Sequence, residues 1–130
     1  MTGAWKLTRR FASAALILLS LGCQALAPNE ATAVLTGTVY RGPIAPVCQP
    51  TVPCDAPFAA TFDVRRGSRR VGTFTSGADG SFSVALPIGE LLVIPHANAP
   101  IMQPTSQSKS VVLPPGGLTG VELFFDTGIR

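Results

Sequence analysis

His96, in the stretch IPHANAP, is the only histidine of this 130-residue chain. An imidazole acts as a catalytic base only when a second group within hydrogen-bonding reach orients it. Asp79 and Asp126 are candidate partners, but the sequence places neither of them beside His96. We therefore predict a surface-loop histidine without a catalytic role and assign no catalytic residue. An enzyme centred on His96 is the alternative.

The cysteines are the next residues that could carry chemistry, and their number, three, is odd. Cys48 and Cys54 close the short segment CQPTVPC, and we predict a disulfide between them if the protein is exported. Five intervening residues and one distant histidine supply too few ligands for zinc, and the spacing is not that of a C-x-x-C redox pair. The acidic residues form no cluster for calcium. We predict no metal and no cofactor.

Four arginines, Arg65, Arg66, Arg69 and Arg70, surround the Gly67-Ser68 turn in VRRGSRRV. Pairing across a hairpin brings these like charges together, which is unfavourable unless solvent or an anion relieves the repulsion. We interpret the stretch as a solvated hairpin tip whose charges discourage edge-to-edge aggregation. Contact with lipopolysaccharide phosphates or another acidic envelope polymer is the functional alternative.

The N-terminus has the layout of an export signal. Lys6, Arg9 and Arg10 precede an apolar run over residues 11–21, which is too short for a membrane-spanning helix. The LSLGC that follows resembles the lipobox of bacterial lipoproteins, in which the chain is cut before the cysteine and the thiol carries a diacylglycerol. This resemblance implies a signal peptide over 1–22, a lipid on Cys23 that anchors the protein to a membrane, and a tether over 23–32.

Ordinary cleavage is the alternative to lipidation. Ala27 and Ala33 each end an A-x-A site, and cleavage at either would leave a secreted or periplasmic protein. In every case we expect export, and the leading expectation is a protein of the bacterial cell envelope that is lipid-anchored to a membrane. Loss of the three basic residues of the signal leaves seven basic residues against seven acidic ones, so the near-neutral mature chain gives no reason to expect nucleic-acid binding.

The elements that must position these residues are short strands. Apolar residues alternate with polar ones in brief runs separated by Gly, Pro, Asp and Ser, and no helix of useful length is indicated. Seven such runs within one domain, 33–130, predict an all-β, seven-stranded, immunoglobulin-like Greek-key sandwich. The predicted strands are 34–40, 58–64, 70–76, 81–86, 90–95, 110–113 and 118–125.

Two features of this plan stay open. A two-residue turn at Gly67-Ser68 leaves Phe62 and Phe74 on opposite faces, so a β-bulge at an unknown position is needed to bring both inward. The segment from Pro95 to Ser110 is the longest irregular stretch, and it is either a binding loop or a proline-rich covering loop.

The run TSGADGSFSVALPIGELLV, residues 75–93, resembles the T-x-x-x-G-x-F-x-x-x-L-P-P-G-x-Y-x-V segment of carboxypeptidase regulatory-like domains. LTGTV, at 35–39, is similar to their first strand, whereas Ile88 replaces the second proline and Leu91 the tyrosine. The resemblance implies the transthyretin-type seven-stranded sandwich and an accessory, positioning or binding role. The ending FFDTGIR resembles the C-termini of small exported bacterial proteins with this fold.

These observations predict a non-catalytic cell-envelope lipoprotein whose sandwich is a binding or structural module. Its expected partners are the membrane, through Cys23, and an envelope protein or polysaccharide. One alternative is a small transthyretin-fold hydrolase-like enzyme using His96, although the chain lacks the histidine set and the Y-R-G-S ending of hydroxyisourate hydrolases. The other is a carbohydrate-binding module, for which few aromatic residues remain once Trp5 leaves with the signal.

Overall fold

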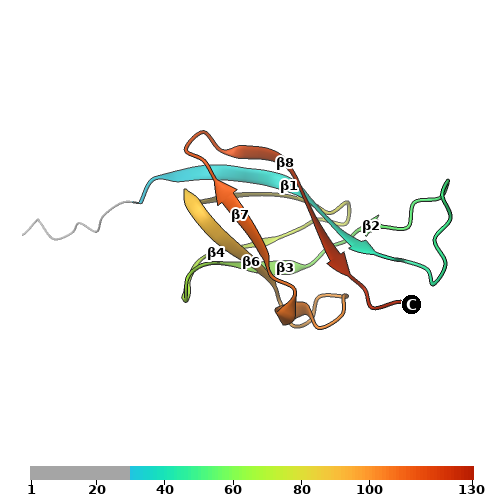
Figure 1. The fold of residues 1–130 in the computed structure, drawn as a ribbon. Coiled ribbons are helices and arrows are strands. Elements are labelled where there is room, and N and C mark those ends of the chain that lie inside the picture. Colours follow the sequence, from blue (N-terminus) through green and yellow to red (C-terminus); the bar gives the residue numbers. More distant parts are fainter. Residues whose placement is uncertain (1–29) are drawn as a thin grey trace, which may run out of the picture.

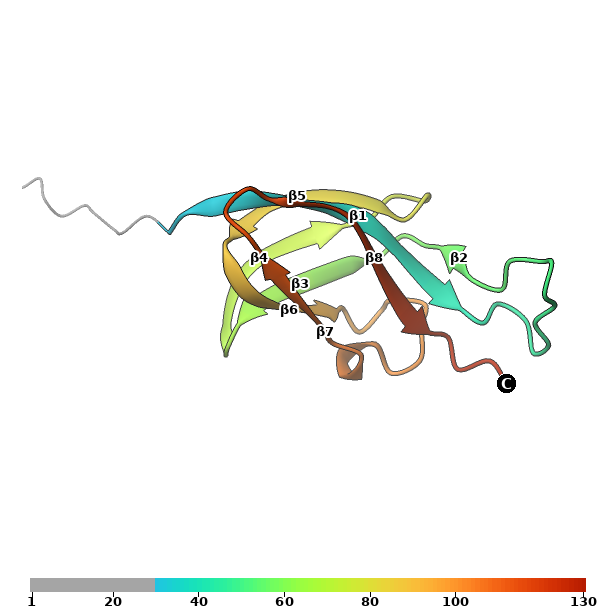
Figure 2. The ribbon, with the colours of Figure 1, turned by 45° about the horizontal axis from the view of Figure 1, so that its top comes forward.

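The computed structural model describes residues 30–130, which form two facing β-sheets (Figures 1 and 2). One sheet has the order β5-β1-β8, with the short β2 also paired to β1, and the other has the order β4-β3-β6-β7. The signal peptide, Cys23, Ala27 and the tether up to residue 29 lie outside the described residues. The strands are β1 (Thr32–Gly42), β2 (Ala56–Pro57), β3 (Thr61–Arg66), β4 (Arg69–Thr75), β5 (Ser81–Pro87), β6 (Gly89–Pro95), β7 (Lys109–Leu113) and β8 (Leu118–Asp126).

The predicted all-β sandwich is confirmed, and the structure adds the short β2 as an eighth strand to the seven that were predicted. The strand expected over 58–64 is shifted, because β3 begins only at Thr61 and continues to Arg66, while β2 ends at Pro57, before the expected start. The buried hydroxyl of Ser76 donates to the Phe58 carbonyl at 2.8 Å and accepts from the Ala60 N–H at 3.0 Å. These bonds satisfy backbone groups that lack a ladder partner, so the chain between the two strands can leave the sheet.

The bulge that the phenylalanines require lies at Val71. Arg65 pairs with Arg70, but Val64 pairs with Gly72, so β4 has one residue more than β3 at this point. The extra residue shifts the register and places Phe62 opposite Phe74 on the inner face. Burial of two aromatic rings therefore selects the bulged register over the simple hairpin.

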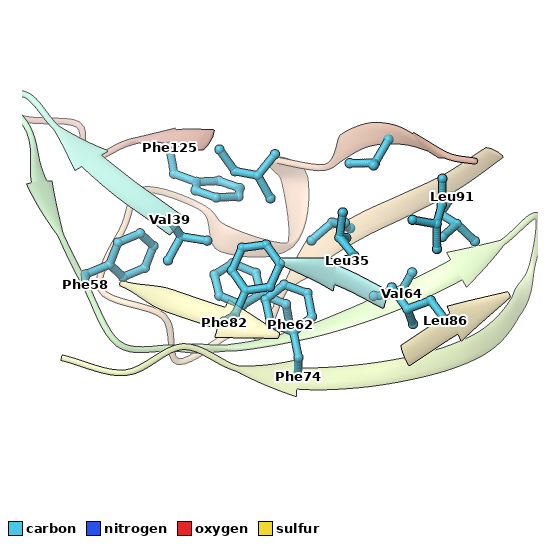
Figure 3. Packing of buried hydrophobic residues seen from close by; sticks show 14 residues of the cluster. Leu35, Val39, Phe58, Phe62, Val64, Phe74, Phe82, Leu86, Leu91 and Phe125 are labelled. Carbon is cyan, nitrogen blue, oxygen red and sulfur yellow. The ribbon is translucent and has the colours of Figure 1, made fainter. Parts of the chain in front are cut away.

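The core lies between the sheets, where five phenylalanine rings meet (Figure 3). Phe62 is fully buried, with its ring centroid 4.9 Å from that of Phe74 and 5.6 Å from that of Phe125. Phe74 in turn stacks on Phe82 at 4.3 Å. Because these rings come from β3, β4, β5 and β8, the cluster joins the two sheets. Aliphatic side chains from both sheets complete the core: Leu35, Val39, Val64, Leu86, Leu91, Val93, Val111, Leu113 and Leu123.

The loop between β6 and β7 is fixed to the end of β8. Gln107 accepts from the Asp126 N–H at 2.7 Å and donates to the Asp126 carbonyl at 2.8 Å. The Met102 N–H donates to the same carbonyl, and Ile101 packs against the core. The segment predicted as either a covering or a binding loop therefore covers one end of the sandwich. Its one helical element is the 3-10 turn η2 (Pro104–Ser106), and no helix within 30–130 is long enough to cross a membrane.

Candidate functional site

The outer face of the β4-β3-β6-β7 sheet carries the residues with chemical potential. Alternation along β3 buries Phe62 and Val64, so the side chains of Asp63 and Arg65 point away from the core. Antiparallel pairing sets Asp63 opposite Thr73 of β4 on one side and opposite Ile94 of β6 on the other. The sheet thus places a carboxylate at the centre of its exposed surface.

Asp63 is the hydrogen-bond partner of His96. The Nε2 atom of His96 lies 2.9 Å from Asp63 Oδ1, and it donates because an ionised carboxylate only accepts. The His96 N–H donates to the Thr61 carbonyl, which extends the β3–β6 ladder and fixes the position of the ring. Thr73 donates its hydroxyl to the same Oδ1 atom at 3.1 Å, and Arg70 Nη1 lies 3.7 Å from it.

The environment of Asp63 favours its charged form. Its side chain is 19% exposed, whereas that of His96 is 37% exposed. The hydrogen bond from His96 is the main cause that lowers the pKa of Asp63 below its ordinary value of 3.8, with smaller contributions from Thr73 and from the positive charge of Arg70. Partial burial opposes this shift but does not reverse it.

An open groove of about 510 Å³ lies over this pair. Ile94 supplies apolar surface, and the β6–β7 loop contributes Asn98 and Thr105. A second hollow of about 200 Å³, lined by Glu90, Leu92 and Ser110 among others, shares Arg65 with the first. The sheet therefore presents a continuous surface on which apolar side chains alternate with groups of both charges.

The prediction for His96 was incomplete. The two carboxylates that the sequence offered lie elsewhere: Asp79 accepts from Ser81 in the β4–β5 turn, and Asp126 pairs with Arg130 at 2.9 Å. Sequence reasoning missed Asp63, although its position between Phe62 and Val64 marked it as outward-facing. The adjacency of β3 and β6, which brings Asp63 to His96, has no local signal in the sequence.

The four arginines of the β3–β4 hairpin all have acceptors within the chain. Glu30 lies 2.7 Å from Arg66 Nη1 and 3.3 Å from Arg69 Nη2. Arg65 Nη1 donates to the Ser68 carbonyl at 3.0 Å, and Arg70 faces the Asp63 carboxylate. These acceptors within the chain relieve the mutual repulsion of the four arginines, and contact with an external anion stays the untested alternative to a solvated hairpin tip.

The predicted disulfide between Cys48 and Cys54 is present, with Cα atoms 5.5 Å apart. It closes the loop between β1 and β2, on which Val47 and Val52 are exposed. In the part of the chain that the structure describes, no group of three or more metal-ligating side chains occurs.

We expect Asp63→Asn to reduce the loss of folding stability that the protein undergoes when the pH is lowered. Because the pKa of Asp63 is lowered in the folded state, the charged carboxylate stabilises the fold above the ordinary value of 3.8. That contribution is lost as the pH falls through the folded-state pKa. Urea midpoints at neutral pH and at pH below 3.8 should therefore differ less for Asp63→Asn than for the wild type. Asp55→Asn, at an exposed aspartate with no ion pair within 30–130, is the control, and an equal reduction in both variants would contradict the prediction.

The fold and the groove together define a β-sandwich domain with a polar ligand-sized surface on one sheet. This fold is similar to that of solved structures, among them two of DUF3823 family proteins. The protein from Bacteroides ovatus matches with a TM-score of 0.50 and 19% identity over 72% of this chain and 43% of its own. The protein from Parabacteroides merdae matches with a TM-score of 0.51 and 19% identity over 75% of this chain and 47% of its own.

At this level of identity the likeness shows the fold alone, and the chain spans less than half the length of either protein. No protein-family model and no curated protein matches the sequence.

Proposed function

We propose that this protein is a non-catalytic binding module of the cell envelope, anchored to a membrane by a lipid on Cys23. The lipobox-like LSLGC supports the anchor, and the disulfide is consistent with an oxidising compartment outside the cytoplasm. The β-sandwich suits the accessory role implied by the resemblance of residues 75–93 to carboxypeptidase regulatory-like domains.

The observation that carries the binding role is the groove over Asp63 and His96. A concave, partly apolar surface with a few converging polar groups is the usual form of a binding site. Here the apolar side chain of Ile94 lies next to the carboxylate of Asp63, the guanidinium of Arg65 and the amide of Asn98. We take the ligand to be an envelope protein, because a polypeptide segment can match this mixture of apolar contacts and charges of both signs.

Site-specific photo-crosslinking in cells tests this role. A photoreactive phenylalanine analogue at the exposed position 98 should give a discrete adduct that protease digests, and the same analogue at position 78, in the β4–β5 turn outside the groove lining, should not. Arg65→Ala should weaken the adduct. Equal adducts at both positions, or none at position 98, would contradict a ligand in the groove. An adduct that resists protease but yields to glycosidase would indicate a polysaccharide instead.

The Asp63–His96 pair favours one second candidate, a small hydrolase. A carboxylate that orients an imidazole is one half of a general-base site, and the Nδ1 atom of His96 would be the basic nitrogen. The non-catalytic role is preferred because, within residues 30–130, no hydroxyl or thiol is hydrogen-bonded to the ring. Hydrolysis of 4-nitrophenyl acetate by the purified protein, if abolished by His96→Gln, would support the enzyme.

The anchor has its own test. The intact mass of the protein from its native membrane fraction should show a chain that begins at Cys23 with acyl groups added. Cys23→Ser should move the protein from the membrane to the soluble fraction. A chain that begins after Ala27 or Ala33 and carries no lipid would remove this part of the proposal.

A further inference from the structure

The arginine hairpin and the start of β1 lie at the same end of the sandwich. In Figures 1 and 2 the β3–β4 turn and the entry of the chain at residue 30 are on the left, whereas the disulfide loop and the C-terminus are on the right. Glu30, two residues before β1, joins the two features directly through its ion pairs with Arg66 and Arg69. The end that receives the N-terminal segment is therefore the end that carries the arginines.

Further hydrogen bonds fasten the entering chain to this end. Arg66 donates through Nη2 to the carbonyl of Ile88, in the turn between β5 and β6. The Ile88 N–H donates to the Ala31 carbonyl at 3.1 Å. Glu30, Arg66, Ile88 and Ala31 thus form a closed ring of contacts across both sheets, which sets where the chain leaves the domain.

The anchor at Cys23, if present, holds this end close to the bilayer. Cys23 precedes Glu30 by seven residues. Even a fully extended chain of that length spans at most about 25 Å, at about 3.5 Å per residue. The hairpin tip is consequently confined to the neighbourhood of the lipid headgroups. Confinement raises the effective concentration of headgroups around the tip, so a contact that is too weak between free molecules can still form.

Charge is distributed unevenly toward the same end. Residues 30–130 carry seven basic and seven acidic side chains, yet four of the seven basic ones lie within the hairpin. Glu30 and Glu90 lie at this end and Asp63 faces Arg70, so the four arginines outnumber three carboxylates there. Arg69 and Arg70 extend furthest into solvent, with side chains 62% and 61% exposed. Both can redirect guanidinium donors to a phosphate, which they bind with favourable geometry.

We propose that the hairpin tip is a second membrane contact, in which Arg69 and Arg70 bind the phosphates of anionic phospholipids in the leaflet that holds the Cys23 anchor. This inference rests on the proposed anchor. The contact would orient the sandwich with its disulfide loop directed away from the bilayer, so that the groove on the β4-β3-β6-β7 sheet faces sideways and stays open to a partner.

Fluorescence quenching by labelled headgroups tests the orientation. The acylated protein, purified from membranes with Ser68→Cys or Ala78→Cys, takes one fluorophore, because Cys23 is acylated and Cys48 is bonded to Cys54. It is reconstituted into vesicles of roughly one part phosphatidylglycerol to three parts phosphatidylcholine, which carry the negative surface potential that attracts basic residues. The label at position 68 should be quenched more strongly than the label at position 78, and high salt should reduce the quenching at position 68, because salt screens the arginine–phosphate contact and leaves the lipid anchor in place.

Arg69→Gln and Arg70→Gln, made together, should weaken the contact of the hairpin tip with the bilayer. The ratio of protein with the tip on the bilayer to protein with the tip in solvent should fall by about 25-fold, which is about fivefold for each arginine. Arg130→Gln, at an exposed arginine of the opposite end, is the matched control and should leave the quenching unchanged. Equal quenching at both positions, or equal quenching in pure phosphatidylcholine vesicles, would overturn the second contact while leaving the anchor intact. A protein that carries no lipid and does not stay with the vesicles would instead refute the anchor.

Discussion

Phe62→Ala is expected to reduce the free energy of unfolding by about 3–5 kcal/mol, the usual cost of removing a buried phenylalanine. The side chain has no exposed surface, and its ring is surrounded by those of Phe58, Phe74 and Phe125. Neither sheet can close the resulting cavity alone, because these rings come from both of them. A loss of this size approaches the whole stability of a small domain, so we expect a large fall in the urea midpoint.

Phe124→Ala is the matched control for this substitution. Phe124 is 47% exposed on the outer face of β8, where its ring stacks on that of Tyr40 at 5.0 Å. Its loss should cost about 1 kcal/mol, the value of a surface aromatic pair. If Phe62→Ala does not fold, Phe62→Leu should fold with an intermediate loss. Equal destabilisation by Phe62→Ala and Phe124→Ala would show that the core does not lie between the two sheets.

Gly37→Ala should also destabilise the protein, by about 3 kcal/mol or more, the upper part of the range for overpacking. A Cβ atom on Gly37 would lie 2.9 Å from the carbonyl carbon of Val121 in β8, and closer still to its oxygen. The obstacle is backbone, so the added methyl group can be accommodated only if β8 moves away from β1. Those two strands pair along most of their length, and such a shift would disturb the whole ladder.

Gly116→Ala separates this close contact from the general effect of replacing glycine. Gly116 lies in the β7–β8 turn, where an added Cβ would meet nothing within 4 Å and where no positive φ is required. Thermal unfolding should show little change for this variant and a lower midpoint for Gly37→Ala. A Gly37→Ala protein as stable as the wild type would mean that β8 does not approach β1 as closely as the structure has it.

The stacked pair of Tyr40 and Phe124 bears on the carbohydrate-binding alternative. The two rings are nearly parallel, at 15° to each other, so each covers one face of the other. A row of free aromatic faces, which a flat sugar-binding surface would use, is not formed by this pair. The groove on the opposite sheet remains the better supported site, and its lining contains no phenylalanine, tyrosine or tryptophan.

The sequence by itself determined the local features of this protein. Alternation of apolar and polar residues located the seven strands and showed which side chains face inward, because successive side chains of a strand point to opposite faces. Cys48 and Cys54, the two cysteines outside the N-terminal segment, predicted the disulfide, and Gly67-Ser68 marked the hairpin turn. Each of these depends on residues that are close together along the chain.

The tertiary structure decided everything that depends on which strands are neighbours. It placed the bulge at Val71. It requires a glycine at position 37, in LTGTV, because the backbone of β8 approaches too closely for a Cβ atom. It also brought His96 to Asp63, 33 residues away in the chain. Alternation assigns a side chain to a face but contains no information about the adjacent strand. Strand neighbours are selected by the packing of the whole core, since only the assembled sheets bury all of its aromatic rings together.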